Sequence, residues 1–165
     1  MPEQRDTDAT HILAQDHRAV EELFEKYTKA SGKSAKVKLA NEICTELKIH
    51  TMIEEEIFYP ALRGKIEDDM LDEAYVEHDS AKVLINEITT NDAEEEFYDA
   101  KVQVLQEQIE HHVKEEEKQK DNMFKQARAT DVDLNALGEQ LLARKKELKQ
   151  QAQTAGLPQA ETTTM

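Results

Sequence analysis

Six side chains with metal-binding donor atoms occur at helical spacings within otherwise apolar stripes of the sequence. Four are histidines and two are glutamates, each glutamate lying four residues after a histidine: His17, His50, Glu54, His78, His112 and Glu116. A spacing of four places the imidazole and the carboxylate one above the other on a single helix face. Imidazole nitrogens and carboxylate oxygens at one level form a mixed site that suits iron, with zinc and manganese as alternatives.

Four long amphipathic segments must position these side chains, and each of them carries one of the four histidines. Apolar residues recur in them at alternating spacings of three and four, the period of a helix that packs one face into a bundle core. The predicted limits are about 7–30, 35–62, 68–89 and 91–129, with turns at Ser31-Gly32-Lys33-Ser34 and at Gly64, and with Asn91-Asp92 as the cap of the fourth helix. The fold predicted is therefore an all-α, up-down-up-down four-helix bundle.

The position of the turns provides a check on this arrangement. Neighbouring antiparallel helices bring two histidines to one level only if the turn lies near the sequence midpoint between them. The first two midpoints fall between Lys33 and Ser34 and on Gly64, within the predicted turns. The third midpoint falls on Glu95, beyond the start predicted for the fourth helix. This connection is therefore either longer than the predicted limits allow or placed later in the sequence.

Glu54 and Glu116 lie on stripes that carry no nearby Lys or Arg. Burying a carboxylate without a partner costs several kcal/mol, whereas a bound cation removes that cost. Two glutamates are enough to bridge two divalent ions, whose charges they nearly cancel together with a bridging hydroxide. The competing interpretation is a metal-free polar network, in which all six side chains must satisfy one another.

The order of these residues resembles the hemerythrin-like, or HHE cation-binding, family over about residues 10–125. The motifs are a lone histidine in the first helix, His50-x-x-x-Glu54 in HTMIEEEIFYP, His78 in EHDSAK and His112-x-x-x-Glu116 in HHVKEEE. The resemblance implies two oxo- or hydroxo-bridged iron ions. It also implies that His17 and His50 bind one iron, that His78 and His112 bind the other, and that the two glutamates bridge them.

Two features differ from the oxygen-carrying hemerythrins. Those proteins have a further histidine one turn from the third-helix ligand, where this chain has Ala74 and Lys82. They also space the last ligand pair as His-x-x-x-x-Asp, whereas this chain has His112-x-x-x-Glu116. Fewer nitrogen ligands leave open positions on iron, which favours peroxide or oxygen chemistry over reversible oxygen carriage.

Other candidate residues are assigned less specific roles. His11 and His111 lie off the stripes and are interpreted as exposed, with a role for His11 at the site or at an entry path left open. Cys44 is next to a core position and is interpreted as an inert thiol. The runs 54–56 and 115–117 each have one inward glutamate, and the rest is interpreted as solvated surface. Three tyrosines could hydrogen-bond near the metals or simply pack: Tyr27, Tyr59 and Tyr75.

Composition and length restrict the class of protein. The chain has 165 residues, of which 38% are apolar and 35% charged, with only 4 Gly and 3 Pro, a usage typical of helices. Its net charge of -15 makes a nucleic-acid partner unexpected. Neither a membrane-length apolar run nor an apolar signal region is present, so that we expect a soluble cytoplasmic protein.

The sequence predicts one domain with two C-terminal additions. Residues 7–130 form the bundle, and residues 131–150 form an accessory amphipathic helix that covers a groove or meets a partner, a second copy of the chain included. Residues 151–165 lack periodicity and are predicted to be a disordered tail.

Two classes of function agree with such a site. The favoured hypothesis is a non-haem diiron protein that handles small oxidants by catalase-like turnover of hydrogen peroxide or by scavenging. The alternative is a protein that binds or senses oxygen or nitric oxide, or stores iron, without turnover. The sequence does not decide whether the chain is an enzyme. The partners expected in either case are small molecules: oxygen, hydrogen peroxide or nitric oxide.

Overall fold

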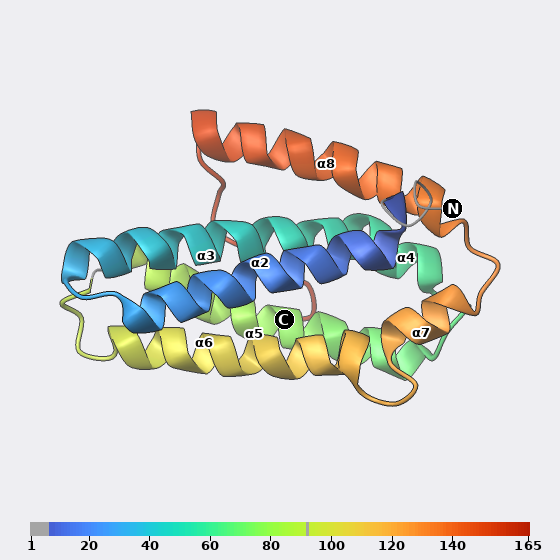
Figure 1. The fold of residues 1–165 in the computed structure, drawn as a ribbon, viewed down its shortest axis with the longest axis horizontal. Helices are drawn as coiled ribbons and strands as arrows, with labels where there is room; N and C mark the ends of the chain where they lie inside the picture. The colour runs from blue at the N-terminus through green and yellow to red at the C-terminus, as the bar shows by residue number, and fades with distance from the viewer. Residues whose placement is uncertain (1–6, 92) are drawn as a thin grey trace.

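Four long helices lie side by side in the computed structural model, which describes residues 7–91 and 93–165 (Figure 1). They are α2 (Ala9–Lys29), α3 (Lys33–Ile53), α5 (Asp68–Thr90) and α6 (Tyr98–Val113). Shorter elements extend or follow them: η1 (Glu54–Phe58), α4 (Tyr59–Leu62), η2 (Lys114–Lys118), α7 (Met123–Arg128) and α8 (Leu134–Thr154). The predicted all-α bundle with an extra C-terminal helix is confirmed. None of the helices described is long and apolar enough to cross a membrane.

The first two connections turn on glycines at left-handed backbone angles. Gly32 has φ 92° and precedes α3, and Gly64 has φ 81° in the turn that follows α4. Residues with a Cβ rarely adopt such angles. The helical run from Lys33 to Leu62 passes without a break through α3, η1 and α4, close to the predicted 35–62.

The third connection differs from the predicted start of the fourth helix. Helix α5 ends at Thr90 and α6 begins at Tyr98, so that the midpoint on Glu95 lies inside the connection and the start predicted at residue 91 is wrong. Asn91, predicted to cap the fourth helix, instead follows α5, and its backbone N–H donates to the Glu87 carbonyl. Asp92, the other predicted cap, lies outside the described residues.

The fourth helix also ends earlier than the predicted residue 129. The run of α6 and η2 stops at Lys118, and Asp121 follows with φ 57°, a left-handed angle that breaks a helix. A new helix, α7, then begins behind Asn122, whose side chain accepts a hydrogen bond from the Lys125 N–H. The apolar pattern of the sequence continues across this break and therefore predicts one helix, whereas the cap at Asn122 starts a separate one.

The core consists of two apolar clusters at different levels of the bundle. One contains Leu13, Ile53 and Phe58, and the other contains Phe24 and Ile85 with their neighbours. In α2 and α5 the predicted metal-binding histidine lies between residues of the first cluster and residues of the second. Burial of these clusters on either side is what holds a polar layer inside the molecule.

Helix α8 lies across the outer faces of α2 and α3 (Figure 1). Asp133 caps it by accepting a hydrogen bond from the Ala136 N–H, and Leu137, Leu141 and Leu148 are buried. The helix was predicted over 131–150 and extends to Thr154. Its leucines cover a groove of the same chain, which is one of the two roles predicted for it.

Residues 156–165, called the C-terminal strap below, differ from the predicted disorder. The strap has no helix, but it returns from α8 to the bundle and runs along α3 and α5 (Figure 1). The Ala160 N–H donates to Asn86 Oδ1 at 2.9 Å, and the Asn86 amide donates to the Ala160 carbonyl at 2.9 Å. Contacts made through the backbone do not require apolar residues at regular spacing. The amphipathic patterns of the sequence therefore do not predict that the strap is ordered.

Candidate metal centre

The six predicted ligands point into one layer of the bundle. Donor atoms of His17, His50, Glu54 and Glu116 lie within 4.8 Å of one another, and so do those of Glu54, His78 and His112. Glu54 belongs to both groups, so that the two groups form one continuous cluster. None of the six residues is more than 6% exposed.

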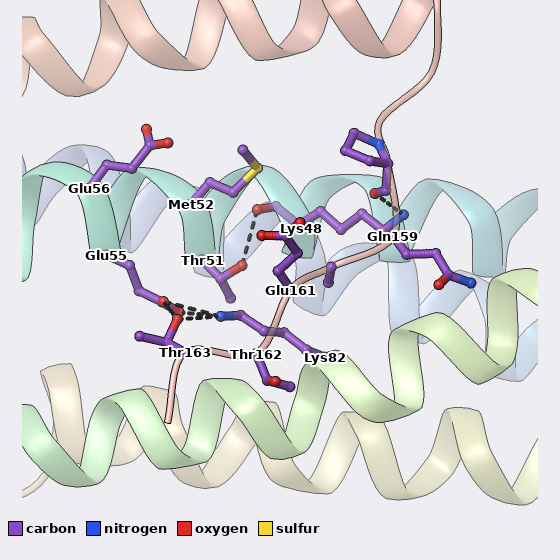
Figure 2. A pocket seen from close by; sticks show the side chains of 12 residues that line it. Lys48, Thr51, Met52, Glu55, Glu56, Lys82, Gln159, Glu161, Thr162 and Thr163 are labelled. Atoms are coloured by element: carbon purple, nitrogen blue, oxygen red, sulfur yellow. Dashed lines mark hydrogen bonds and ion pairs between the residues drawn. The ribbon is translucent and has the colours of Figure 1, made fainter. Parts of the chain in front are cut away.

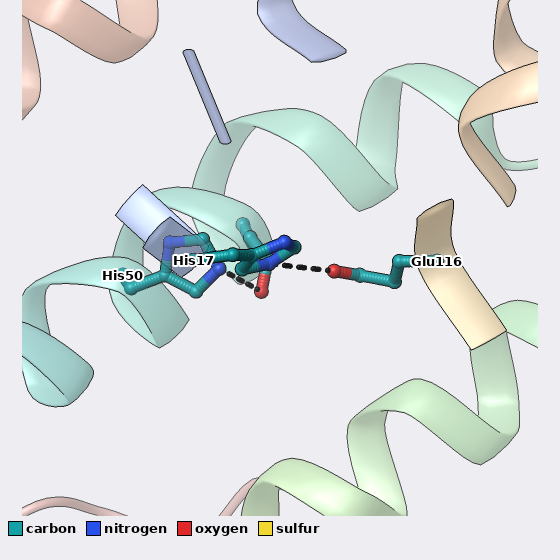
Figure 3. Close-up of side chains that lie close together, drawn as sticks. His17, His50 and Glu116 are labelled. Carbon is teal, nitrogen blue, oxygen red and sulfur yellow. Dashed lines mark ion pairs between the residues drawn. The ribbon is translucent and has the colours of Figure 1, made fainter. Parts of the chain in front are cut away.

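The first half of the cluster contains the histidines of α2 and α3. Their ring centroids are 4.9 Å apart. His17 Nε2 lies 3.3 Å from Glu116 Oε1, and His50 Nε2 lies 3.3 Å from Glu54 Oε1. Figure 3 shows both imidazoles and the Glu116 carboxylate directed toward a common space.

The second half contains the histidines of α5 and α6. His78 Nε2 lies 3.0 Å from Glu54 Oε1, and His112 Nε2 lies 3.2 Å from Glu116 Oε2. Each glutamate therefore approaches one histidine in each half. This is the arrangement that two bridging carboxylates require.

Several of these donor atoms make no hydrogen bond within the described part of the chain and have at most ion-pair contacts with their neighbours in the cluster. They are buried and belong to four of the six residues: His17 Nε2, His50 Nε2, both Glu54 oxygens and Glu116 Oε1. Buried polar atoms are normally paired, and each one left unpaired costs about 1–3 kcal/mol. Imidazole and carboxylate groups with inward lone pairs suit divalent iron, so that the residues present fit a bound metal.

A second layer of carboxylates holds the outer nitrogen of each of the four histidines in the cluster. Each Nδ1 atom lies next to one carboxylate oxygen: His17 with Glu117 at 3.3 Å, His50 with Asp16 at 3.0 Å, His78 with Glu55 at 2.8 Å and His112 with Glu77 at 2.7 Å. A carboxylate that accepts the Nδ1 proton leaves the Nε2 lone pair facing inward, as a metal ligand must.

The sequence interpretation missed this second layer. Glu55 and Glu117 had been assigned to solvated surface because each directly follows an inward glutamate, yet their side chains are only 12% and 11% exposed. The available signal was that both come right after a ligand within an acidic run. Nothing in the sequence marked Asp16 or Glu77.

Cations lie behind three of the four outer carboxylates. Lys145 of α8 pairs with Asp16, Arg18 pairs with Glu117, and Lys82 lies 2.9 Å from Glu55. Charge therefore alternates outward from the cluster, from inner carboxylate and imidazole to outer carboxylate and then to Lys or Arg. Without these cations, the inner and outer carboxylates would repel one another at such short distances. The alternation of charge compensates that repulsion.

The protonation of the cluster reflects these partners. Burial lowers the pKa of His50, but the charge of Glu54 and the hydrogen bond to Asp16 outweigh it and raise the pKa to about 10. Burial and the Glu54 charge raise the pKa of Glu116, but His112 and His17 bring it down to about 2. Without metal, His50 is therefore an imidazolium and Glu116 a carboxylate at neutral pH, and a metal must displace the His50 proton.

Both inner glutamates of the cluster lie in π-helical turns. Glu54 begins η1, where the Tyr59 N–H donates to its carbonyl five residues back, and Glu116 lies within η2. Single π turns inside α-helices are frequent at functional sites. Each π turn here also contains the outer carboxylate next in sequence, Glu55 or Glu117.

Of the three tyrosines considered from the sequence, Tyr59 reaches the cluster. Its hydroxyl donates to Glu116 Oε2 at 2.7 Å and lies 3.2 Å from the Nε2 atoms of His78 and His112. Burial and the two inner glutamates raise its pKa well above the usual value, so that the phenol stays protonated. Tyr27 instead donates to Asp99 at 2.6 Å.

His11, whose role the sequence left open, and Cys44, interpreted as an inert thiol, both lie outside the cluster. His11 is exposed and contacts Gln15 at 3.1 Å. Cys44 is buried, and burial raises the pKa of its thiol to about 12, which keeps it protonated and unreactive.

A helical bundle that buries a layer of histidines and glutamates defines a class of metal-binding proteins. The family model "Hemerythrin HHE cation binding domain" matches residues 8–119. The chain therefore belongs to the hemerythrin HHE cation-binding family and is a metal-binding protein.

Comparison with solved structures supports the fold. The crystal structure of a hemerythrin HHE cation binding domain-containing protein from Mycobacterium kansasii is similar, with a TM-score of 0.74 and 24% sequence identity. The similarity covers 91% of this chain and 94% of the other chain. The comparison with curated proteins gives no match.

Proposed function

We propose that the chain is a non-haem diiron protein that handles small oxidants, with catalase-like turnover of hydrogen peroxide as its activity. In this proposal His17 and His50 bind one iron, His78 and His112 bind the other, and two glutamates bridge them. The observation that carries the proposal is the arrangement of Glu54 and Glu116, each of which approaches a histidine in both halves of the cluster.

The ligand count supports chemistry at open positions. Two imidazoles and two shared carboxylates supply four protein ligands per iron, fewer than the six of an octahedral ion. The Tyr59 hydroxyl lies at the His78 and His112 side, where it can donate a hydrogen bond to a small molecule. The closed apolar clusters on either side favour molecules of only a few atoms.

Peroxide disproportionation requires both electrons and protons to be exchanged. One hydrogen peroxide takes up two electrons and two protons and forms two waters, and a second gives up the same number and forms oxygen. Two iron ions held by the six residues would supply the two-electron store that this exchange requires. The Tyr59 hydroxyl, which donates to Glu116 Oε2 at 2.7 Å, keeps its proton and is the hydrogen-bond donor beside the site.

The test of the diiron proposal is iron per chain together with the visible spectrum, for the wild type and for His50→Ala and Glu116→Ala. About two irons per chain and an oxo-bridge absorption band are expected in the wild type, with both lost in the variants. Oxygen evolution from peroxide is then measured on the loaded wild type. Folded variants with as much iron as the wild type would contradict the ligand assignment.

A second candidate is binding of oxygen or nitric oxide, for sensing or storage, without turnover. The buried Tyr59 hydroxyl favours it equally, because a donor beside an open metal position also stabilises a bound diatomic molecule. A loaded sample that evolves no oxygen from peroxide, yet changes its spectrum reversibly with oxygen or nitric oxide, would select this function instead.

The proposal includes a cytoplasmic location. Cys44 is the sole cysteine and is a buried free thiol, as is usual in a reducing compartment.

A further inference from the structure

The C-terminal strap ends on a buried carboxylate of α5. Asp79 is completely buried and directly follows His78. Its Oδ1 atom accepts the Thr163 N–H at 2.7 Å, and its Oδ2 atom accepts the Thr164 N–H at 2.6 Å as well as the Thr164 hydroxyl. Two backbone N–H groups and a hydroxyl are the donors that stabilise a buried carboxylate. The strap therefore supplies most of the hydrogen bonds that Asp79 needs.

The same segment reaches the carboxylate that holds His78. The Thr163 hydroxyl donates to Glu55 Oε1 at 2.6 Å and accepts from Lys82 Nζ at 3.2 Å. Glu55 Oε2 in turn lies 2.8 Å from His78 Nδ1. Figure 2 shows Thr163, Lys82 and Glu55 converging at one end of the pocket. A continuous chain of hydrogen bonds thus runs from the strap to one of the four histidines.

The strap is held here mainly by polar contacts. Between it and helices α3 and α5 lies a cavity of about 500 Å³, lined by Met52, Glu55, Lys82 and strap residues 158–163. Thr163 and Thr164 are both exposed. Since little apolar packing holds the end of the strap, single hydrogen bonds decide where Thr163 lies.

We propose that the C-terminal strap is a positioning element of the metal centre, in which Asp79 anchors the strap and Thr163 orients Glu55, and thereby His78. This inference rests on the proposed diiron function. The strap then supports the His78 and His112 side of the centre, whereas within the described residues it does not contact the outer carboxylates of His17 and His50. The iron on that side is then the more sensitive of the two to changes in the strap.

The test compares three variants of the full chain loaded with iron. Thr163→Val removes the hydroxyl, Thr163→Ser restores it, and Thr162→Val removes a neighbouring hydroxyl that bonds to none of Asp79, Glu55 or Lys82 in the described structure. The readouts are iron per chain, the visible spectrum and the time course of iron release to a ferrous chelator after reduction.

We expect Thr163→Val to release one of its two irons roughly threefold to tenfold faster than the wild type, with the second iron unchanged. Thr163→Ser and Thr162→Val should match the wild type. The selective loss of one iron separates positioning from a general loss of stability, which would accelerate both. Equal release from Thr163→Val and the wild type would overturn the proposal.

A second arm examines the anchor without any metal. Hydrogen–deuterium exchange of the metal-free chain should show that the Thr163 and Thr164 amides are protected in the wild type and exchange freely in Asp79→Ala. Unchanged protection in Asp79→Ala would overturn the anchoring role. A wild-type chain that binds no iron, yet shows this protection, would overturn the diiron proposal while confirming that the strap is anchored.

Discussion

Each imidazole of the cluster is held at both of its nitrogens. The inner Nε2 atoms face Glu54 and Glu116, and the outer Nδ1 atoms face four different carboxylates. A histidine that is fixed in this way has one tautomer and one ring orientation available when a metal is bound. Six acidic residues thus surround the four histidines, three times as many as the two glutamates of the sequence motifs.

Tyr59→Phe tests the role of the one hydroxyl in the cluster. Since Phe keeps the ring and loses only the hydroxyl group, we expect about two irons per chain as in the wild type. Peroxide turnover should fall by at least about tenfold, because a positioned proton donor typically contributes more than that. Iron content and oxygen evolution are the measurements.

Tyr75→Phe is the matched control. The Tyr75 ring contacts the Tyr59 ring at 5.3 Å, but the residue is not part of the His and Glu cluster, so that its variant should keep wild-type turnover. If Tyr59→Phe turns over peroxide as fast as the wild type, the hydroxyl has no role in turnover and Tyr59 contributes only packing.

At the scale of elements, two kinds of interruption shape the bundle. The π turns η1 and η2 contain the two inner glutamates, Glu54 and Glu116, and the break after Lys118 separates α7 from the fourth helix. Phe124 of α7 then stacks on His17, with ring centroids 5.9 Å apart. The short helix therefore closes the bundle next to the cluster, which one uninterrupted fourth helix would not do.

Gly138 of α8 is expected to be intolerant of a side chain. A Cβ atom at this position would lie 1.6 Å from the Thr7 carbonyl oxygen and 3.0 Å from Ile12 Cδ1. Alanine stabilises an ordinary helix interior by about 1 kcal/mol relative to glycine. We nevertheless expect Gly138→Ala to lower the free energy of unfolding by about 1–3 kcal/mol, because the two segments must separate.

Urea unfolding of the metal-free chain measures this difference. Gln140→Ala, at an exposed position of the same helix, should stay within about 0.5 kcal/mol of the wild type. A Gly138→Ala chain that is as stable as the wild type would show that α8 does not depend on this close contact.

At the scale of the whole molecule, the cluster makes stability depend on pH. In the metal-free chain the pKa of His50 is raised to about 10, and those of His17 and His112 are also raised by their carboxylates. A raised folded-state pKa stabilises the fold fully below the unfolded value of about 6.5 and loses that effect as the pH rises through the folded value. We therefore expect Tm to fall by roughly 5 °C or more between pH 6.5 and pH 10.

Calorimetry at several pH values, with and without iron, measures this effect. The Tm of the iron-loaded chain should fall less over the same pH range, because the metal replaces the protons between imidazole and carboxylate. His50→Gln serves as the control for general repulsion in a chain of net charge -15. If the Tm of the metal-free wild type falls with pH as steeply as that of His50→Gln, the pH dependence comes from the net charge and not from His50.

The sequence alone determined which six side chains share a level, because helical period and turn position are local properties of the chain. His50 and Glu54 are one helical turn apart whatever the bundle does, and the turn at Gly64 brings His78 to the same level. The midpoint on Glu95 likewise placed the third connection more correctly than the apparent cap at Asn91.

Only the tertiary structure decided what surrounds those six side chains. His17 and Glu117 are 100 residues apart, Asp16 meets Lys145 of α8, and Asp79 meets a strap that has no periodicity. Such pairs depend on which faces of distant helices come together, and surface acids and cations are too frequent in this chain to identify them by type. Long-range packing therefore selects the outer carboxylates and the strap, whereas local helix geometry selects the cluster they support.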